Sequence, residues 1–270
     1  MMWFAKPASR TAPCFPTSRT GFSARPWRRF ARPCPPTDPM AQPAVLFEDN
    51  HCLAMCKPAG LLTQGVSGAA PSLEDAARDY LRATYGKKGR VYLGIPHRLD
   101  RPVSGVVLFA KSSKAAARLA EQFRDRVVRK VYWAVLESSS VTQSWHGPVT
   151  WTDHMRKVSE ESRAEIVEAG ADGAKLAEME VECLGWDQAC LRVEMRPVTG
   201  RMHQLRLQAA SRGLPIVGDQ QYGAKAAVGL VGSRESPIAL HARWLRFLHP
   251  IRYEPVELTA PLPPHWPANP

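Results

Sequence analysis

The sequence has 270 residues, enough to bury one large hydrophobic core or two small ones. Its hydrophobic content of 44% and charged content of 23% are ordinary for a globular protein. It contains no run of about 18 apolar residues, so no membrane-spanning helix is expected. The 36 Lys and Arg residues against 25 Asp and Glu give a formal charge of +11, which favours a polyanionic partner.

Residues 1–40 differ in composition from the rest of the chain. They hold seven basic residues, one acidic residue and eight prolines, and so carry +6 of the net charge. Such a segment cannot bury enough apolar surface to offset its chain entropy, and we expect it to be disordered. Three interpretations stay open: an organellar transit peptide, a basic tail that binds RNA, or an extension ahead of a true translation start at Met40.

The six cysteines do not have the spacing of a metal site. The pair Cys52 and Cys56 has no second pair near a histidine cluster. We therefore expect no metal, and reduced, mostly buried thiols in a reducing compartment. The remaining cysteines are Cys14, Cys34, Cys183 and Cys190.

The folded region is expected to begin near residue 44. Two short strands, 44–47 and 52–56, flank a turn at 48–50, and Lys57-Pro58-Ala59-Gly60 ends the second strand. A helix follows over 72–85.

Ser72 and Asp75 form the capping-box pattern that begins this helix. Its apolar face is expected to hold Leu73, Ala76, Ala77, Tyr80 and Leu81. The basic loop 85–90 is either a solvated surface loop or a contact to a nucleic acid backbone.

The stretch 97–105 reads His97-Arg98-Leu99-Asp100-Arg101-Pro102-Val103-Ser104-Gly105. Asp100 stands between Arg98 and Arg101, and the following proline and Ser-Gly pair predict a stiff turn into a buried strand over 106–110. Reactive groups are often placed on a loop that a rigid scaffold positions. The alternative is an ordinary loop salt bridge between Asp100 and one of its arginines.

Further elements are expected in chain order. A helix begins at Ser112 or Ser113, and a strand over 129–136 carries Tyr132. The buried face of that helix is expected to hold Ala116, Leu119, Ala120 and Phe123. Residues 137–175 are weakly patterned.

The second half of the chain shows an antiparallel pair of strands, 176–184 and 189–195. A helix is expected from Gly200 to Gly213, and a strand over 240–250. The first turns of the helix carry an unusual polar load of Arg201, His203, Gln204 and Arg206.

Several separated stretches resemble the motifs of the RluA-type pseudouridine synthases, in the same order. They are His-Arg-Leu-Asp with Ser-Gly at 97–105, Lys-x-Tyr-x-Ala at 130–134, Thr-Gly-Arg-x-His-Gln-Leu-Arg at 199–206, Pro-Ile-x-Gly-Asp at 215–219 with Tyr222-Gly223, and Leu-His-Ala at 240–242. The resemblance covers residues 44–264, which we expect to form the catalytic domain. Pro102-Val103 and Met202 depart from the usual family residues.

The resemblance implies an α+β fold with a mixed, largely antiparallel sheet flanked by helices. It implies that Asp100 is catalytic, that Tyr132 stacks near the target base, and that Arg206 pairs with Asp100. Arg98 is suited to fill the space left by a flipped base, because guanidinium planes stack on bases. The residues expected to bind RNA are Arg98, Arg101, Arg201, His203 and Gln204, with His203 as a hydrogen-bonding residue at a helix start.

The implied reaction isomerises uridine to pseudouridine in structured RNA, either ribosomal or transfer RNA. Nothing is oxidised or hydrolysed, so neither a cofactor nor a metal is required. Whether Asp100 attacks the sugar, attacks the base or abstracts a proton stays open. We expect a monomer in the cytoplasm, or in an organelle if residues 1–40 are a transit peptide.

Two alternatives belong to other functional classes. One is a catalytically silent RNA-binding or chaperone protein on the same fold, against which the intact Asp100, Tyr132 and Arg206 argue. The other is a hydrolase that uses Asp100 with His97 or His203, against which the lack of a Gly-x-Ser-x-Gly motif and of metal-ligand spacing argues.

Overall fold

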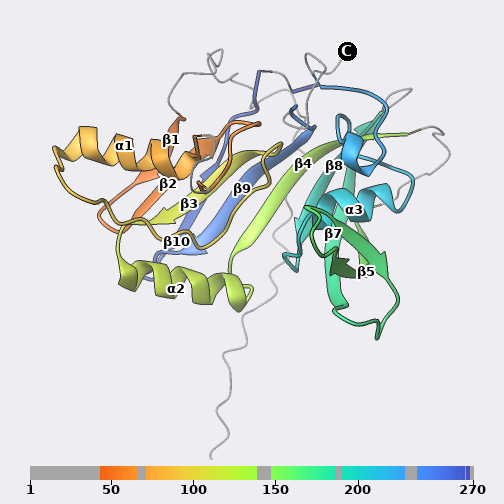
Figure 1. The fold of residues 1–270 in the computed structure, drawn as a ribbon, viewed down its shortest axis with the longest axis horizontal. Helices are drawn as coiled ribbons and strands as arrows, with labels where there is room; N and C mark the ends of the chain where they lie inside the picture. The colour runs from red at the N-terminus through yellow and green to blue at the C-terminus, as the bar shows by residue number, and fades with distance from the viewer. Residues whose placement is uncertain are drawn as a thin grey trace, which may run out of the picture. The chain divides into compact units, whose positions relative to one another are not determined.

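The computed structural model describes residues 43–65, 71–138, 147–186, 190–228, 236–264 and 266–267 (Figure 1). All of them belong to one compact unit, Arg32–Pro270. The predicted disordered segment 1–40 lies outside the described residues. No helix in the described part of the chain is long and apolar enough to cross a membrane.

Ten strands form one sheet. They are β1 (Val45–Glu48), β2 (Cys52–Lys57), β3 (Ser104–Ala110), β4 (Arg129–Glu137), β5 (Val149–Lys157), β6 (Ala164–Val167), β7 (Lys175–Trp186), β8 (Cys190–Pro197), β9 (Leu240–Leu248) and β10 (Pro255–Thr259). Their order is β1-β2-β3-β9-β4-β8-β7-β5-β6, and β10 pairs with β9. Of these pairings only that of β3 with β9 is parallel, which confirms the prediction of a mixed, largely antiparallel sheet.

Three α-helices accompany the sheet: α1 (Leu73–Tyr85), α2 (Ser113–Arg124) and α3 (Gln204–Ala210), with a short 3₁₀ helix at Gln220–Tyr222. Figure 1 shows α1 and α2 beside the half of the sheet that holds β1 to β3, and α3 beside the other half, where it contacts β5 and β6. An α+β fold is thus confirmed.

The capping signals of α1 and α2 are confirmed. Ser72 and Asp75 form the complete capping box of α1, and the Ser112 side chain accepts from the amide of Ala115 at the start of α2. The predicted face of α2 is wrong at Ala120, which is exposed, while Ala115 is fully buried.

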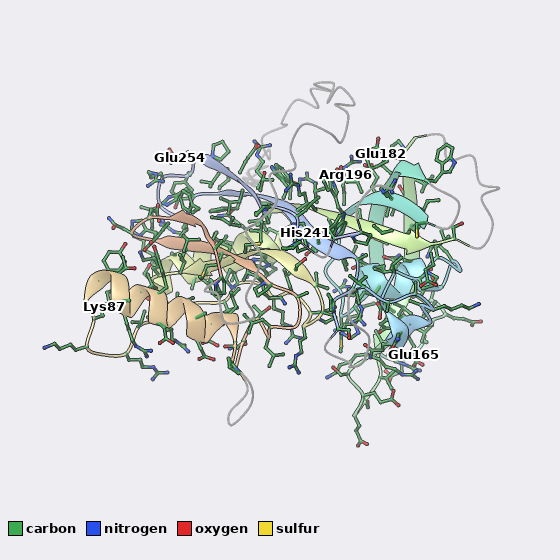
Figure 2. All side chains as sticks on the ribbon, turned by 90° about the horizontal axis from the view of Figure 1, so that it is seen from above. Lys87, Glu165, Glu182, Arg196, His241 and Glu254 are labelled. Atoms are coloured by element: carbon green, nitrogen blue, oxygen red, sulfur yellow. The ribbon has the colours of Figure 1, made fainter. Side chains whose placement is uncertain are left out.

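Every residue of β3 is buried, as expected for a central strand. Its side chains Val106 and Leu108 form a hydrophobic core with Leu119 of α2 and with Leu245 and Phe247 of β9. The other half of the sheet carries ion pairs between strands: Arg196 of β8 pairs with Glu180 and Glu182 of β7 at 2.5 and 2.6 Å, and Figure 2 shows Arg196 beside Glu182. The loop that carries Asp100 thus leads directly into the best-packed strand.

The close pairing of β3 with β9 requires a glycine. Gly105 has φ +121°, and a Cβ on it would lie 2.6 Å from the amide nitrogen of Ala242. Next to it, Ser104 Oγ lies 2.8 Å from Nδ1 of His241, and both side chains are buried. Figure 2 shows His241 on β9. The Ser-Gly and Leu-His-Ala motifs, far apart in sequence, are therefore one packing unit that fixes the end of the Asp100 loop.

Three expectations differ from the structure. The weakly patterned stretch 137–175 contains β5 and β6, which form because β7 offers β5 an antiparallel partner. The predicted helix at Gly200 begins only at Gln204 and ends at Ala210, because His203 adopts a left-handed conformation with φ 52°. Arg201 and His203 therefore precede the helix.

Candidate active site

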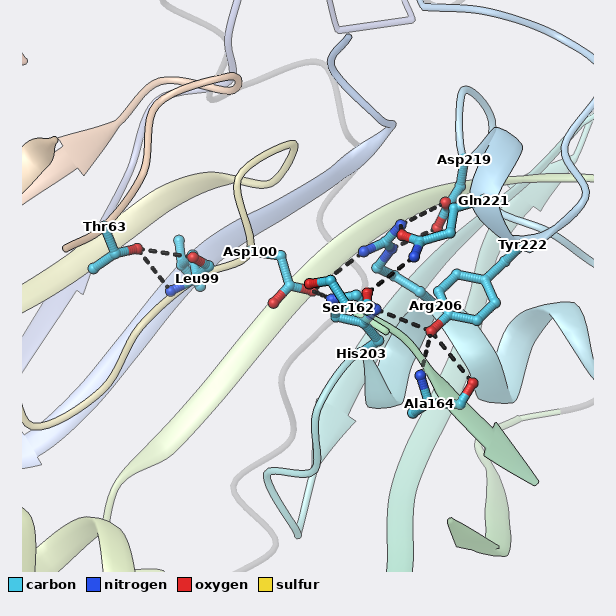
Figure 3. Close-up of polar contacts among 10 residues, drawn as sticks. All are labelled: Thr63, Leu99, Asp100, Ser162, Ala164, His203, Arg206, Asp219, Gln221 and Tyr222. Carbon is cyan, nitrogen blue, oxygen red and sulfur yellow. Dashed lines mark hydrogen bonds and ion pairs between the residues drawn. The ribbon is translucent and has the colours of Figure 1, made fainter. Parts of the chain in front are cut away.

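The Asp100 loop is fastened on both sides of the carboxylate. Thr63 Oγ1 donates to the carbonyl of Leu99 at 2.8 Å and accepts from its amide at 3.1 Å (Figure 3). The fully buried Lys57 donates to the carbonyl of Arg101 at 3.0 Å, and burial lowers the pKa of Lys57 to about 7. The backbone around Asp100 is therefore held by buried groups rather than by surface ion pairs.

His97 fastens the start of the same loop to β3. Its Nε2 accepts a hydrogen bond from the amide of Leu108 at 2.9 Å, and its ring stacks on Phe123 of α2 with centroids 4.6 Å apart. Burial, together with the charge of Lys130, lowers the pKa of His97 to about 3. His97 is therefore a neutral structural acceptor, which removes it as the base of a hydrolase.

Asp100 faces a buried arginine that is itself paired. Asp100 Oδ2 lies 3.6 Å from Arg206 Nη1, while Arg206 donates to both carboxylate oxygens of Asp219 at 2.6 and 2.7 Å (Figure 3). Arg206 and Asp219 are 5% and 1% exposed, and Asp100 is 31% exposed. The tight pair is thus Arg206–Asp219, and Asp100 extends from it towards solvent.

Burial opposes the charge of Arg206, but its hydrogen bonds to Asp219 and the charges of Asp219 and Asp100 outweigh that effect and raise its pKa. Gln221 accepts a further hydrogen bond from Arg206 at 2.9 Å. The guanidinium is therefore permanently charged and rigidly oriented next to Asp100.

His203 lies near the same carboxylate oxygen, with Nε2 3.7 Å from Asp100 Oδ2 (Figure 3). The amide of Ala164 donates to the Tyr222 hydroxyl at 3.0 Å, and His203 Nδ1 lies 2.9 Å from that hydroxyl. The Tyr222 hydroxyl also lies 3.5 Å from the carbonyl of Ala164, so Tyr222 and Ala164 together hold the imidazole ring of His203 next to Asp100 (Figure 3). Burial lowers the pKa of His203, so the imidazole is neutral at pH 7.

Tyr132 comes to the cleft from β4. The register of β4 against β9 shifts between Val131 and Tyr132, and such a bulge changes where a side chain points. Burial and the charge of Asp100 both raise the pKa of Tyr132, so its phenol is neutral. Tyr132 therefore offers an uncharged aromatic ring beside Asp100.

These groups line one cleft with a volume of about 670 Å³, a size suited to a small ligand or a single nucleotide. The cleft is lined by Arg98, Asp100, Tyr132, Arg201, His203, Gln204 and Arg206 among the residues predicted for the site. The remaining predicted residue, Arg101, does not line it, since its Nε donates to the carbonyl of Gly60 at 2.9 Å.

Gln204 lines the cleft but uses its side chain within the protein. Its Oε1 accepts from Thr199 at 2.8 Å and from the amide of Arg201 at 3.0 Å, and its Nε2 donates to the carbonyl of Glu178 at 3.1 Å. These bonds hold the loop before α3 on β7. Arg201 Nε is likewise bonded, to the carbonyl of Leu176 at 2.8 Å.

The sequence analysis assigned no role to Asp219, Gln221 or Tyr222, although all three hold the residues around Asp100. The sequence does mark Asp219 as a candidate. The Gly-Asp pair directly follows the apolar Pro-Ile-Val run, which is typical of a buried turn, and a buried carboxylate needs a partner. The identity of that partner depends on tertiary structure.

Among the described residues, the group with metal-ligand types in reach of one another is Asp49, Cys52 and His249. Its atoms already have partners: Asp49 Oδ2 lies 2.7 Å from His249 Nε2, and its Oδ1 accepts from the amides of His51 and Cys52. Burial raises the pKa of the Cys52 thiol to about 12. The group fastens β1–β2 to the end of β9 and does not line the cleft.

The arrangement keeps one carboxylate, a fixed guanidinium and an aromatic ring in a cleft with basic walls. Such a site suits chemistry on a group carried by a polyanion.

Comparisons with known proteins give the family. The chain matches the family described as RNA pseudouridylate synthase over residues 51–211. It is 35% identical over 221 residues to the dual-specificity RNA pseudouridine synthase RluA of Vibrio vulnificus, covering 80% of this chain and 81% of that protein. The RluA of Pasteurella multocida is 34% identical, and the match covers 84% of this chain and 95% of that protein. The ribosomal large subunit pseudouridine synthase C of Vibrio vulnificus is 31% identical, and the match covers 82% of this chain and 66% of that protein.

Solved structures agree on the fold. Human RNA pseudouridylate synthase domain containing 4 superposes with a TM-score of 0.65 at 23% identity, covering 83% of this chain and 90% of that chain. Human RNA pseudouridylate synthase domain containing 1 superposes with a TM-score of 0.60 at 26% identity, covering 81% of this chain and 83% of that chain. The chain therefore belongs to the RluA-type RNA pseudouridine synthases, isomerases that act on RNA, as the sequence motifs predicted.

Proposed function

We propose that Asp100 is the catalytic carboxylate of this synthase and that its substrates are uridines in structured ribosomal or transfer RNA. The observation that carries the proposal is the position of Asp100 in the cleft, 3.6 Å from a guanidinium that Asp219 holds in place. The fixed positive charge of Arg206 attracts the negatively charged side chain of Asp100 and so positions it. The relatives named for the ribosomal large subunit support a ribosomal target.

The isomerisation breaks the carbon–nitrogen glycosidic bond, and the uracil turns and rejoins the sugar through carbon 5. Asp100 acts beside the sugar or the base in its ionised form. His203, whose Nε2 lies 3.7 Å from Asp100 Oδ2, borders the same carboxylate and is a positioning residue for it. Arg206 is a positioning residue that fixes the charge next to Asp100.

The target uridine has to leave its stack to reach Asp100, at a cost of a few kcal/mol. Arg98 is exposed at the cleft and is two residues from Asp100, so its guanidinium is suited to occupy the vacated position. Tyr132 stacks on the extruded uracil. Arg201 contacts the RNA at the rim of the cleft, whereas Arg101 and Gln204 act through the loops that they hold.

The proposed partner is RNA, bound by a monomer without a cofactor or metal, and the bacterial relatives support a cytoplasmic setting. Light scattering of the purified protein with and without RNA tests the monomer. Fractionation of cells that express the full chain and the 40–270 variant tests the organellar alternative for residues 1–40.

The proposal is tested by mapping pseudouridine at nucleotide resolution in total RNA from cells with and without the protein. One or a few sites should vanish without the protein and return with the wild type but not with Asp100→Ala. Restoration by Asp100→Ala would overturn the role of Asp100. If no site changes in a strain without a second synthase for the same position, the chain acts as a silent RNA-binding protein.

A further inference from the structure

The wall of the cleft between α2 and β4 carries two basic side chains for which the proposed reaction has no use. Arg126 lies in the turn after α2, and Lys130 lies on β4 two residues before Tyr132. Both line the cleft, with Val128 between them. Tyr132, after the register shift in β4, lines the same cleft.

Neither of these side chains is paired with another residue that the structure describes. Among the described residues, no carboxylate lies within 4.0 Å of either terminal group, whereas the neighbouring Arg124 pairs with Glu121 and Asp125. Burial lowers the pKa of Lys130. An unpaired ammonium in a cleft wall is suited to receive an anion from outside.

The backbone of Arg126 is unusual for an arginine. It has φ 59°, and the amide of Val127 bonds to the carbonyl of Gln122 at 2.9 Å while the amide of Arg126 reaches that of Phe123 at 3.4 Å. This is the Schellman ending of a helix, in which the left-handed position usually holds glycine because other residues are strained there. A non-glycine residue that is kept in a strained backbone conformation and lines a cleft is a candidate for a functional role.

We propose that Arg126 and Lys130 form a binding site for the RNA backbone, in which each contacts a phosphate next to the extruded uridine. Phosphodiesters are the anions that an RNA brings to this cleft, so the inference rests on the proposed function. The ammonium of Lys130 lies next to the loop before α3, 3.9 Å from the position of a Cβ on Gly200, so the proposed phosphate site is continuous with Arg201 at the rim of the cleft.

The chain offers a matched control. Arg129 has the same charge, is exposed on the same strand and does not line the cleft. The variants are Arg126→Gly, Lys130→Met, Lys130→Arg and Arg129→Gln, each in the full chain. The probe is an unmodified tRNA transcript, whose dissociation constant is measured from 50 to 200 mM salt, and the urea midpoint is measured for each variant.

Arg126→Gly should raise the urea midpoint, because glycine relieves the strained backbone, and yet weaken RNA binding by about threefold to tenfold. The logarithm of the binding constant falls as the logarithm of the salt concentration rises. Arg126→Gly and Lys130→Met should each make this slope less steep by about 0.7 to 0.9, the change for one lost phosphate contact. Lys130→Arg should keep the slope, and Arg129→Gln should change neither slope nor affinity.

Unchanged affinity and slope in both Arg126→Gly and Lys130→Met would overturn the site, as would an equal effect of Arg129→Gln. A fall in turnover without a change in slope for Lys130→Met would also overturn it, since Lys130 would then act on the uracil. If Lys130→Met does not fold, Arg126→Gly decides the outcome. Failure of the wild type to form pseudouridine in any RNA would refute the proposed function instead, and the salt slopes would still report on the phosphate contacts.

Discussion

Breaking the pair of Arg206 and Asp219 should damage both stability and catalysis. Asp219→Asn keeps the shape of the side chain but removes the charge that faces the guanidinium. Asp219 is 1% exposed and holds Arg206 through two bonds of 2.6 and 2.7 Å. The variant leaves the 5% exposed Arg206 with uncharged neighbours, Gln221 and the ring of Tyr222, and with the more distant Asp100 carboxylate.

Removing one partner of a buried ion pair costs about 3–5 kcal/mol. We expect the urea midpoint to fall by about 1–2 M for a domain of this size. We also expect kcat to fall by about 100-fold, because the guanidinium next to Asp100 loses its fixed position and a misplacement of about 1 Å has an effect of that size. Urea unfolding followed by fluorescence and single-turnover pseudouridine formation provide the two measurements.

A double variant separates the two effects. Arg206→Met with Asp219→Leu replaces the buried pair by apolar groups of similar size, and such exchanges are often neutral or stabilising. It should recover most of the lost stability and none of the activity. The account would be refuted if Asp219→Asn kept the wild-type urea midpoint, or if the double variant regained wild-type turnover.

Three further predictions concern the scaffold of the site. The pKa of His97 is about 3 in the folded protein against an ordinary 6.5. The neutral imidazole therefore contributes stability that is complete above pH 6.5 and falls by about 2 kcal/mol at pH 5. His97→Gln should flatten this decline in urea titrations from pH 7 to 5, and an unchanged decline would contradict the burial of a neutral His97. Gly105→Ala should cost about 3 kcal/mol or more, because its Cβ would overlap the backbone of Ala242, whereas Gly89→Ala, with no heavy atom within 4 Å, should change the melting temperature little. Ser72→Ala should cost about 1 kcal/mol through loss of the capping box and leave kcat unchanged, and a fall in kcat would show that α1 takes part in the reaction.

Elements with local signals could be predicted from the sequence. The helix α1 has its capping box and apolar face within one short stretch, and β3 is a single buried run, so both were predicted close to their observed bounds. The start of α3 could not be predicted, because the left-handed conformation of His203 accompanies a hydrogen bond to Tyr222, which is distant in the sequence. The same reason applies to β5 and β6, which depend on pairing across the sheet.

The candidate site was predictable as a set of residues but not as a geometry. The motifs indicated Asp100 and Arg206 because the chain resembles a known family. No pattern in the sequence indicated that Asp219 holds Arg206 more closely than Asp100 does, or that Arg101 turns away from the cleft towards Gly60. Arg101 bonds to Gly60 after β2, and the loop of Asp219 bonds to the end of β4, so both facts depend on contacts between segments that are distant in the sequence.

The most direct test of the central claim is pseudouridine formation by purified Asp100→Asn, which keeps the size of the side chain and removes its charge. Wild type and variant are incubated with unmodified ribosomal and transfer RNA, and the pseudouridine formed per enzyme is counted, with circular dichroism and RNA affinity as controls for folding and binding. We predict turnover by the wild type and none by Asp100→Asn, with folding and RNA affinity retained. Turnover by Asp100→Asn at the wild-type rate would contradict the assignment of Asp100 as the reacting carboxylate.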